Sequence, residues 1–386
     1  FGDYAFFAGE PYGATLGANP EFSLQCLHEW EMRGYSRETC AYYRNVCGSM
    51  FLDKYFFTGG PFPKFDFIWS DRHCPSGHPK AHQVIAEYQG IPIYAIDDEL
   101  HHQQSGKMEQ RLEYWAGQLL DGIEWIEKVT GRKFDEEKAI EEVKNSFKCE
   151  VIWGEINLLN NAIPAPMDFK SLMAFVPLPS IAKGRRSTNE FLETLLDELK
   201  DRISEGIAAV PNEKYRLVFY GPPPYSTLRM FRVFEKEGVN FVACLWYAQG
   251  LWAKMVYHED GSIVPTKTPE ELGWPPMKSR EDIIRTMVRW RMEFPSASHY
   301  DDVLEKSTLK AVDFVRHFKA DGMVLTSQLG CVPSNLGVYD FKLAFQKAGI
   351  PVMMLAYSIA DSRDNDDAKI IRQMDAFFET IKASKG

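Results

Sequence analysis

The chain has 386 residues, of which 45% are apolar, and this length and composition suit two or three domains around a sizeable core. Its formal net charge of −10 argues against a nucleic-acid-binding surface and favours a cytoplasmic protein. No stretch approaches the roughly 20 apolar residues that span a bilayer, so no membrane segment is expected. The first residue is Phe1, and a targeting segment ahead of it stays an open alternative.

The N-terminal part begins with a segment, residues 1–60, that is rich in Gly, Phe and Tyr and predicts one helix at residues 21–33. Residues 61–150 then predict a first α/β lobe with a helical extension. Its elements are a strand at 65–70, a helix at 79–88, a strand at 91–96 and two amphipathic helices over 105–150. A strand–helix–strand unit of this kind builds a parallel sheet with a right-handed crossover.

The C-terminal part predicts a second α/β lobe over residues 214–386, after a connecting segment at 151–213. Prolines make the connecting segment irregular over 160–180, and a helix is expected at 188–207. The lobe itself predicts strands at 216–221, 239–246, 322–327 and 350–357, and helices at 226–238, 280–292, 301–318, 338–349 and 366–383. The fold class is therefore α/β.

The seven cysteines are odd in number and widely scattered, which is not the pattern of a disulfide scaffold. No C-x-x-C motif occurs, so neither a zinc ribbon nor a thioredoxin-like motif is expected, and a reducing compartment is favoured. The chain also has no Walker motif, no G-x-G-x-x-G and no G-x-S-x-G. We therefore do not expect it to hydrolyse ATP or to bind a dinucleotide in the usual way.

Two distant segments share one pattern around a cysteine: "FDFIWSDRHCPSGHPKAHQVIAEYQGIPIYAI" and "GMVLTSQLGCVPSNLGVYDFKLAFQKAGIPVMML". Each reads as an apolar strand, a Ser or Thr at its end, a cysteine, a proline, a helix, Gly-Ile-Pro and a second strand. Cys74 and Cys331 thus stand at the carboxyl end of a parallel strand, where open α/β sheets bind ligands. If the two units face each other, both thiols converge in the cleft between them.

Several interpretations of these two thiols stay open from the residues alone. They can be incidental loop cysteines, one can be a nucleophile, or both can share in binding a metal group. Cys40, in the polar and aromatic stretch "SRETCAYYRNVCGS", is the best third ligand. Zinc with His73 as a fourth ligand is conceivable, but thiolates from distant loops suit an iron–sulfur cluster better.

The other cysteines and the histidines have simpler interpretations. Cys26, Cys47 and Cys244 are predicted to be core residues, and Cys149 is expected at the end of an amphipathic helix. An H-x-x-x-H pair can bind zinc on a helix, but the glutamate of the metalloprotease motif is missing. A solvated polar face is therefore predicted for His78, His82, His101 and His102.

Five stretches in chain order resemble the 2-hydroxyacyl-CoA dehydratase / benzoyl-CoA reductase family, most closely the larger catalytic (B-type) subunit of ATP-dependent benzoyl-CoA reductases. They are "GEPYGATLGANPEF", "GYSRETCAYYRN", "FDFIWSDRHCPSGHPK", "YRLVFYGPPPYSTLRMFRVFEKEGVNFV" and "LTSQLGCVPSNLG". The resemblance implies two Rossmann-like (flavodoxin-like) lobes with helical segments, and a [4Fe-4S] cluster on Cys40, Cys74 and Cys331. The chain departs from the family where Pro75 follows the cysteine and Lys80 supplies the base.

The resemblance also implies partners: a homologous cluster-bearing subunit in a heterodimer, an ATP-hydrolysing iron–sulfur activator, and an acyl-CoA substrate. The first functional hypothesis is a catalytic subunit that reduces an aromatic acyl-CoA thioester in one-electron steps. The second is a subunit of a 2-hydroxyacyl-CoA dehydratase, which eliminates water through a ketyl radical. A non-catalytic electron-relay subunit comes third and a non-redox zinc scaffold last.

Overall fold

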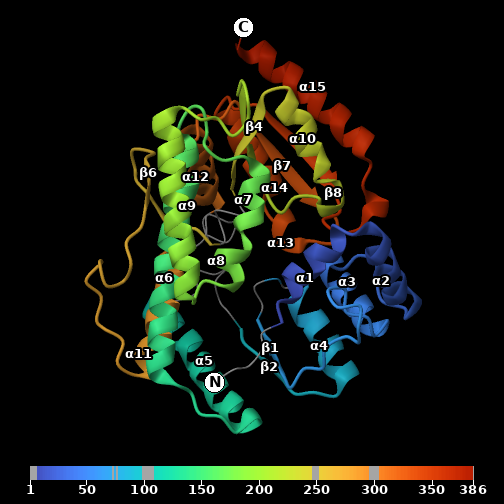
Figure 1. Cartoon of the computed structure of the whole chain (residues 1–386), viewed down its shortest axis with the longest axis vertical. Coiled ribbons are helices and arrows are strands. Elements are labelled where there is room, and N and C mark those ends of the chain that lie inside the picture. Colours follow the sequence, from blue (N-terminus) through green and yellow to red (C-terminus); the bar gives the residue numbers. More distant parts are fainter. Residues whose placement is uncertain are drawn as a thin grey trace.

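The structure is a computed structural model that describes residues 7–71, 74, 77–97, 108–245, 252–294 and 304–385. Helices surround parallel strands throughout (Figure 1), which confirms the predicted α/β class. In the described part of the chain, no helix is both long and apolar enough to cross a membrane.

The central sheet has four parallel strands in the order β4-β3-β7-β8. They are β3 (Tyr215–Phe219), β4 (Val239–Cys244), β7 (Gly322–Gln328) and β8 (Val352–Tyr357). All six residues of β4 are buried, as expected for a parallel strand covered on both faces. β4, the next of these strands along the chain after β3, lies on one side of β3, and β7, which comes later, lies on its other side. A topological switch point therefore lies between the carboxyl ends of β3 and β7.

Helices of the second unit cover this sheet. Pairwise contacts place α10 against β4, and α14 against both β7 and β8. Figure 1 shows α15 along the outer side of the sheet and the N-terminal helices next to α13. The bounds are α10 (Arg229–Lys236), α12 (Leu304–His317), α13 (Val332–Asn335), α14 (Val338–Lys347) and α15 (Asp367–Lys385).

The first α/β unit is smaller than the sequence predicted. Its β1 (Ile68–Ser70) and β2 (Ile93–Ala95) form a two-stranded parallel sheet that is joined through α4 (His78–Gln89). Gly90 ends α4 in the left-handed conformation, with φ of 67°. The parallel connection is as predicted, but the described residues of this unit do not form a full second Rossmann-like sheet.

The N-terminal segment holds three helices where one was predicted: α1 (Gly9–Gly17), α2 (Pro20–Met32) and α3 (Ala41–Phe51). Glycines of this segment allow the helices to pack closely. A Cβ on Gly13 would lie 2.5 Å from the Tyr42 carbonyl oxygen, and one on Gly48 would lie 2.0 Å from the Cys26 carbonyl oxygen. The three helices therefore pack backbone to backbone, which only glycine permits.

Gly48 gives a direct test of this packing. We expect Gly48→Ala to lower the free energy of unfolding by about 2–3 kcal/mol, because the methyl group meets the backbone of α2 rather than a flexible side chain. Gly117 is the matched control, since it also lies inside a helix but has nothing within 4 Å of an added Cβ. Gly117→Ala should raise stability by about 0.5–1 kcal/mol. Urea denaturation of both variants measures the two stability changes. Equal changes would contradict the close backbone packing at Gly48.

The connecting region is more regular than predicted. It contains α7 (Phe169–Phe175), α8 (Pro177–Ile181) and the predicted helix α9 (Arg186–Glu205). The two helices predicted over 105–150 are α5 (Met108–Thr130) and α6 (Glu136–Leu158), and the helix predicted at 280–292 is α11 (Arg280–Glu293). The proline-rich stretch that was expected to be irregular contains α7 and α8. The Asp168 carboxylate caps α7 by accepting from the Ser171 N–H, and Pro177 occupies the first turn of α8, where proline is tolerated.

Two further features complete the fold. An antiparallel hairpin of β5 (Met255–Tyr257) and β6 (Ile263–Pro265) was not predicted. One continuous hydrophobic cluster joins the N-terminal helices, the first unit and the central sheet. The domain boundaries at residues 60, 150 and 213 therefore remain predictions.

Candidate functional site

Three segments far apart in the sequence bring Cys40, Cys74 and Cys331 into one neighbourhood. Cys40 directly precedes α3, Cys74 lies between β1 and α4, and Cys331 follows β7 and directly precedes α13. A Cβ placed on Gly77 would lie 3.2 Å from the Cys74 sulfur and 3.4 Å from the Cys40 Cβ. Cys74 and Cys40 therefore flank the same small residue at the start of α4.

Gly330 joins the Cys331 loop to the Cys40 segment. Its φ is +76°, and an added Cβ would lie 2.7 Å from the Thr39 carbonyl oxygen. Only glycine allows the two backbones to approach this closely. Cys331 also stands at the switch point of the central sheet, where α/β proteins bind ligands. The predicted convergence of Cys74 and Cys331 is thus what the structure shows, with Cys40 beside them.

The other four cysteines lie outside this group. Cys26, Cys47, Cys149 and Cys244 are each 0% exposed within the hydrophobic core. This confirms the core interpretation of Cys26, Cys47 and Cys244. The expectation that Cys149 ends a helix was wrong, because α6 continues to Leu158 and leaves Cys149 in its middle.

The three gathered thiols are held in the protonated form in the metal-free chain. Burial and the neighbouring Cys331 raise the pKa of Cys40 to about 12, while burial and the Cys40 and Cys331 charges raise the pKa of Cys74 well above its usual value. Burial also raises the pKa of Cys331. Binding of a metal group to such thiols would release their protons.

Backbone N–H groups already point at these sulfurs. The N–H groups of Tyr42 and Tyr43 lower the pKa of Cys40 against the effect of burial, and Gly77 does the same for Cys74. Such donors stabilise negative charge on sulfur and tune the potential of sulfur-bound metal groups. Among the described residues, no three His, Cys, Asp or Glu side chains are arranged to hold a single metal ion. A cluster presents a separate iron to each thiolate, so its ligands need not converge on one point.

The predicted solvated face of histidines is wrong for His78 and His82. Both rings pack edge-on against Tyr43, which is buried at 5% exposure, and their centroids lie 5.1 and 5.5 Å from its ring. The helical spacing of α4 places Ala81 and Ile85 in the core, so the histidines on the same side reach α3. His73, His101 and His102 fall outside the described residues.

His78 carries a charge beside the cysteines. Its Nδ1 lies 2.9 Å from an Asp71 carboxylate oxygen and its Nε2 3.8 Å from a Glu10 oxygen. Burial alone lowers the pKa of His78, but Asp71 and Glu10 outweigh it and raise that pKa to about 9. His82 behaves oppositely: burial and the neighbouring His78 lower its pKa to about 4, and its Nδ1 lies 3.0 Å from the Ser70 hydroxyl.

The raised pKa of His78 sets the direction of a pH effect. Its ion pairs stabilise the fold fully below pH 6.5, the ordinary histidine value, and their contribution disappears as pH rises through about 9. We expect His78→Gln to be less stable than the unaltered protein at pH 6 and nearly equal to it at pH 10. Denaturation curves at both values, run on the protein prepared without metal, test this. A difference that grows with pH would contradict it.

A buried ion network holds the segment that carries Cys40. Arg44, which is 2% exposed, lies 3.1 Å from the fully buried Asp361 carboxylate and donates from Nε to the Thr39 carbonyl oxygen. Asp361 also accepts from Arg363, and Arg363 pairs with Glu31. Burial raises the pKa of Asp361, but the hydrogen bonds of Arg363 and the charge of Arg44 outweigh it and hold that pKa below its usual range. The network thus fastens the residues around Cys40 to the segment after β8.

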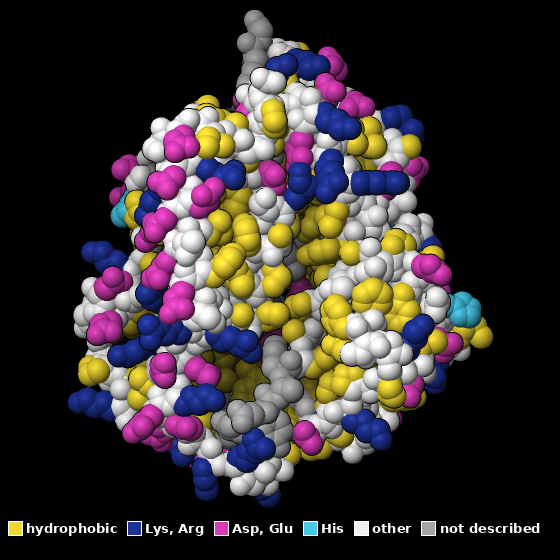
Figure 2. Space-filling view, in the orientation of Figure 1, with side chains coloured by type: hydrophobic (Ala, Val, Ile, Leu, Met, Phe, Trp, Pro, Cys, Tyr) yellow, Lys and Arg dark blue, Asp and Glu magenta, His cyan; other side chains and the backbone are white. Residues whose placement is uncertain are grey.

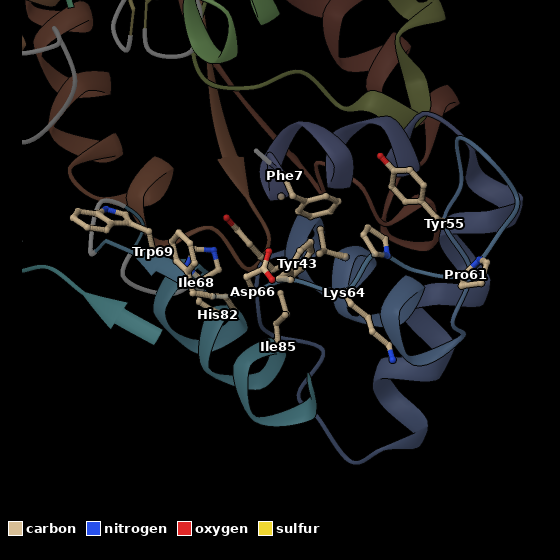
Figure 3. Close-up of a pocket in the computed structure, with 15 residues that line it drawn as sticks. Phe7, Tyr43, Tyr55, Pro61, Lys64, Asp66, Ile68, Trp69, His82 and Ile85 are labelled. Atoms are coloured by element: carbon tan, nitrogen blue, oxygen red, sulfur yellow. The ribbon is translucent and has the colours of Figure 1, made fainter. Parts of the chain in front are cut away.

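An aromatic pocket of about 570 Å³, shown in Figure 3, lies on the other side of Tyr43 from Gly77. Its wall is mostly apolar, with Asp66, Lys64 and His82 among its polar members. Tyr43 separates the two sites, because its ring lines the pocket and also lies 3.3 Å from the position of a Gly77 Cβ. The lining residues are Phe7, Gly9, Tyr43, Val46, Tyr55, Pro61, Pro63, Lys64, Phe65, Asp66, Phe67, Ile68, Trp69, His82 and Ile85.

Sequence reasoning missed several members of this site. Glu10 acts electrostatically on Cys40, Cys74 and Cys331. It lies in "GEPYGATLGANPEF", which was used only as one of the five stretches that resemble the family, and no role was predicted for its glutamate. Arg44 follows Cys40 by one helical turn, and its backbone N–H donates to the Cys40 carbonyl oxygen. Nothing in the sequence signals that its side chain has a partner 317 residues away.

The fold and the site define a class: an α/β protein that gathers three thiols, two of them buried, with two of the three following parallel strands. A family model described as "2-hydroxyglutaryl-CoA dehydratase, D-component" matches residues 17–381, and the chain belongs to this family. This confirms the resemblance that the five stretches indicated.

Relatives of two kinds match most of the chain. The (R)-2-hydroxyisocaproyl-CoA dehydratase alpha subunit of Clostridioides difficile is 24% identical over 94% of this chain and 82% of the relative. The B subunit of benzoyl-CoA reductase from Thauera aromatica is 23% identical over 91% of this chain and 78% of the relative. The (R)-phenyllactyl-CoA dehydratase alpha subunit of Clostridium sporogenes is 23% identical over 97% and 84%. Because the identities to the dehydratase and the reductase subunits are nearly equal, the closer resemblance to the reductase remains a prediction.

Proposed function

We propose that this chain is the iron–sulfur catalytic subunit of a heteromeric enzyme that acts on aromatic acyl-CoA thioesters, of the benzoyl-CoA reductase type. The observation that carries the proposal is the convergence of Cys40, Cys74 and Cys331 from three distant segments beside an aromatic pocket. The names of its relatives, all subunits of acyl-CoA enzymes, support the substrate class and the heteromeric assembly. Electrons would come from an ATP-driven activator.

Cys40, Cys74 and Cys331 would hold the cluster. When bound there, a cluster with three protein thiolates supplies low-potential electrons and one iron site open to a water or a thioester oxygen. The pocket would bind the acyl group, since flat aromatic walls suit a ring and exclude water from a strong reductant. His78 holds a proton close to Cys74 at neutral pH, because Asp71 and Glu10 keep it charged.

Dehydration of a 2-hydroxyacyl-CoA is the second candidate function, because relatives of that kind match equally well. The two reactions differ in their electron balance. Ring reduction consumes electrons and protons with every product formed, whereas dehydration releases one water and returns its activating electron.

The test uses the complex isolated anaerobically through a tag on this chain, with benzoyl-CoA and (R)-phenyllactyl-CoA as substrates. Stoichiometric use of ATP and reductant with benzoyl-CoA supports reduction, and turnover of (R)-phenyllactyl-CoA after a single activation supports dehydration instead. Conversion of neither thioester would overturn the aromatic specificity. Equilibrium dialysis of benzoyl-CoA against the isolated chain then separates a catalytic role from an electron relay, because a relay has no reason to bind the thioester.

A further inference from the structure

His82 brings a ring nitrogen to the aromatic pocket that the protein itself does not use. The ring lines the pocket, and Figure 3 shows it toward the end that holds Trp69, away from Tyr55 and Pro61. Its Nδ1 lies 3.0 Å from the Ser70 hydroxyl oxygen. Its Nε2 has no hydrogen-bond partner among the described residues, so this nitrogen is free to bind a ligand.

The buried Ser70 decides which nitrogen of His82 carries the proton. Ser70 is 1% exposed, and in the part of the chain that the structure describes its hydroxyl has no partner besides His82. A hydroxyl always has a proton to donate, and a buried donor without an acceptor costs free energy. Ser70 therefore donates to Nδ1, and we assign the proton of the neutral ring to Nε2.

The neighbours of His82 keep its ring fixed and uncharged. Tyr43 packs against it at an interplanar angle of 84°. The charged His78 lies beside it, with the ring centroids 5.5 Å apart, and both nitrogens of His78 face the carboxylates of Asp71 and Glu10. Burial and the charge of His78 lower the pKa of His82 to about 4. At neutral pH the ring is thus a hydrogen-bond donor and not an acid.

The surroundings of this donor make its hydrogen bond strong. Most of the pocket wall is apolar, and Figure 2 shows mainly hydrophobic side chains where Figure 1 places α1 and α3. A hydrogen bond in such a poorly hydrated site is stronger than one in water. The donor also lies toward the cysteines, because Tyr43 contacts both the His82 ring and the position of a Gly77 Cβ.

We propose that His82 donates from Nε2 to the carbonyl oxygen of the thioester, and that it stabilises the negative charge which this oxygen gains when the acyl group takes up one electron. The inference rests on the proposed function, which places the acyl group in the pocket and supplies the low-potential electron. No covalent bond forms or breaks in this step, and the proton stays on Nε2. A neutral N–H donor suits a carbonyl oxygen that becomes charged, while the aromatic remainder of the wall suits the ring of the substrate.

The first measurement compares benzoyl-CoA with S-benzyl-CoA, a thioether of similar shape that lacks the carbonyl oxygen. Equilibrium dialysis uses the complex isolated anaerobically through a tag on this chain, without ATP or reductant. We expect the unaltered complex to bind the thioester about 3- to 10-fold more tightly than the thioether, which is the effect of one neutral hydrogen bond. His82→Leu should remove this difference by weakening the thioester alone.

The second measurement is the turnover of the same complex. His82→Leu should lower kcat about 100-fold or more, as for the loss of one donor to a developing oxyanion, and should change KM far less. His82→Gln keeps an N–H donor near the place of Nε2 and should recover most of the lost rate. The matched control is Gln83→Leu, at the next and exposed position of α4, which should leave both constants unchanged. Thermal unfolding checks that every variant is folded.

Three outcomes would overturn the inference and leave the proposed function standing. His82→Leu can keep the unaltered difference between thioester and thioether, it can weaken both compounds equally, or it can turn over at the unaltered rate. Failure of the unaltered complex to bind either compound would contradict the proposed function together with the inference.

Discussion

Replacing Cys74 by alanine is expected to abolish the iron–sulfur signals of the protein and to lower its activity more than about 100-fold. That loss exceeds the 10–100-fold typical of removing a group that only hydrogen-bonds a ligand. The reason is that Cys74 lies beside Cys40 at the start of α4, and its loss would leave only two of the three proposed ligands. Iron and sulfide counting and electron paramagnetic resonance after anaerobic reconstitution measure the outcome. A retained cluster in Cys74→Ala would refute the ligand set.

Cys47 is the matched control for this experiment. It lies on α3, the helix that Cys40 precedes, and is 0% exposed inside the core. Cys47→Ala should keep the cluster and lower the free energy of unfolding by about 1 kcal/mol through lost packing. Cys244→Ala, at the end of β4, should behave in the same way. Loss of the cluster in either control would show that the assay reports stability and not ligation.

Asp361→Ala is expected to lower the free energy of unfolding by about 3–5 kcal/mol, the cost of breaking a buried ion pair. Asp361 is fully buried, and its removal leaves the buried Arg44 with Glu31, at 3.6 Å, as its one carboxylate among the described residues. Without Asp361, Arg44 is no longer held in place against the carbonyl oxygen of Thr39, the residue before Cys40. The affinity for iron should therefore fall about 10-fold or more, even though no proposed ligand is changed. Urea denaturation and iron retention during dialysis measure the two effects.

The control for Asp361 is Asp367, which pairs with the exposed Arg229 at the surface. Asp367→Ala should cost at most about 1 kcal/mol. The pKa of Asp361 is held below its usual range, so its stabilisation is present above about pH 4 and decreases as pH falls further. The difference between the unaltered protein and Asp361→Ala should therefore shrink in acid. Equal losses of stability for the two aspartate variants at pH 7 would contradict the role of the buried ion network in holding the Cys40 segment.

The sequence predicted those parts of the fold whose signals are local. The strands of the central sheet are short apolar runs next to helices that end in glycine, and they were placed within a few residues. The repeated pattern around Cys74 and Cys331 predicted their convergence, because each thiol follows the carboxyl end of a parallel strand and the two units were expected to face each other across a cleft. Two of the three N-terminal helices were missed because a glycine-rich segment gives a weak helical signal, and the packing role of Gly13 and Gly48 depends on which helix lies opposite.

The polar contacts of the site could not be predicted from the sequence for the same reason. His78 and His82 looked like a solvated pair because their spacing on α4 shows no partner, and the partner is Tyr43 on another helix. The pairing of Arg44 with Asp361 joins residues at opposite ends of the chain. Contacts of this kind are fixed by tertiary packing, which leaves no periodic trace in the sequence.

The central claim is that Cys40, Cys74 and Cys331 together hold one iron–sulfur cluster. The most direct test is a crystal structure of the anaerobically purified chain, with anomalous scattering recorded at the iron edge. We expect one iron–sulfur cubane bonded to the sulfurs of Cys40, Cys74 and Cys331. Iron bound elsewhere, or protein that stays free of iron after anaerobic reconstitution, would contradict it.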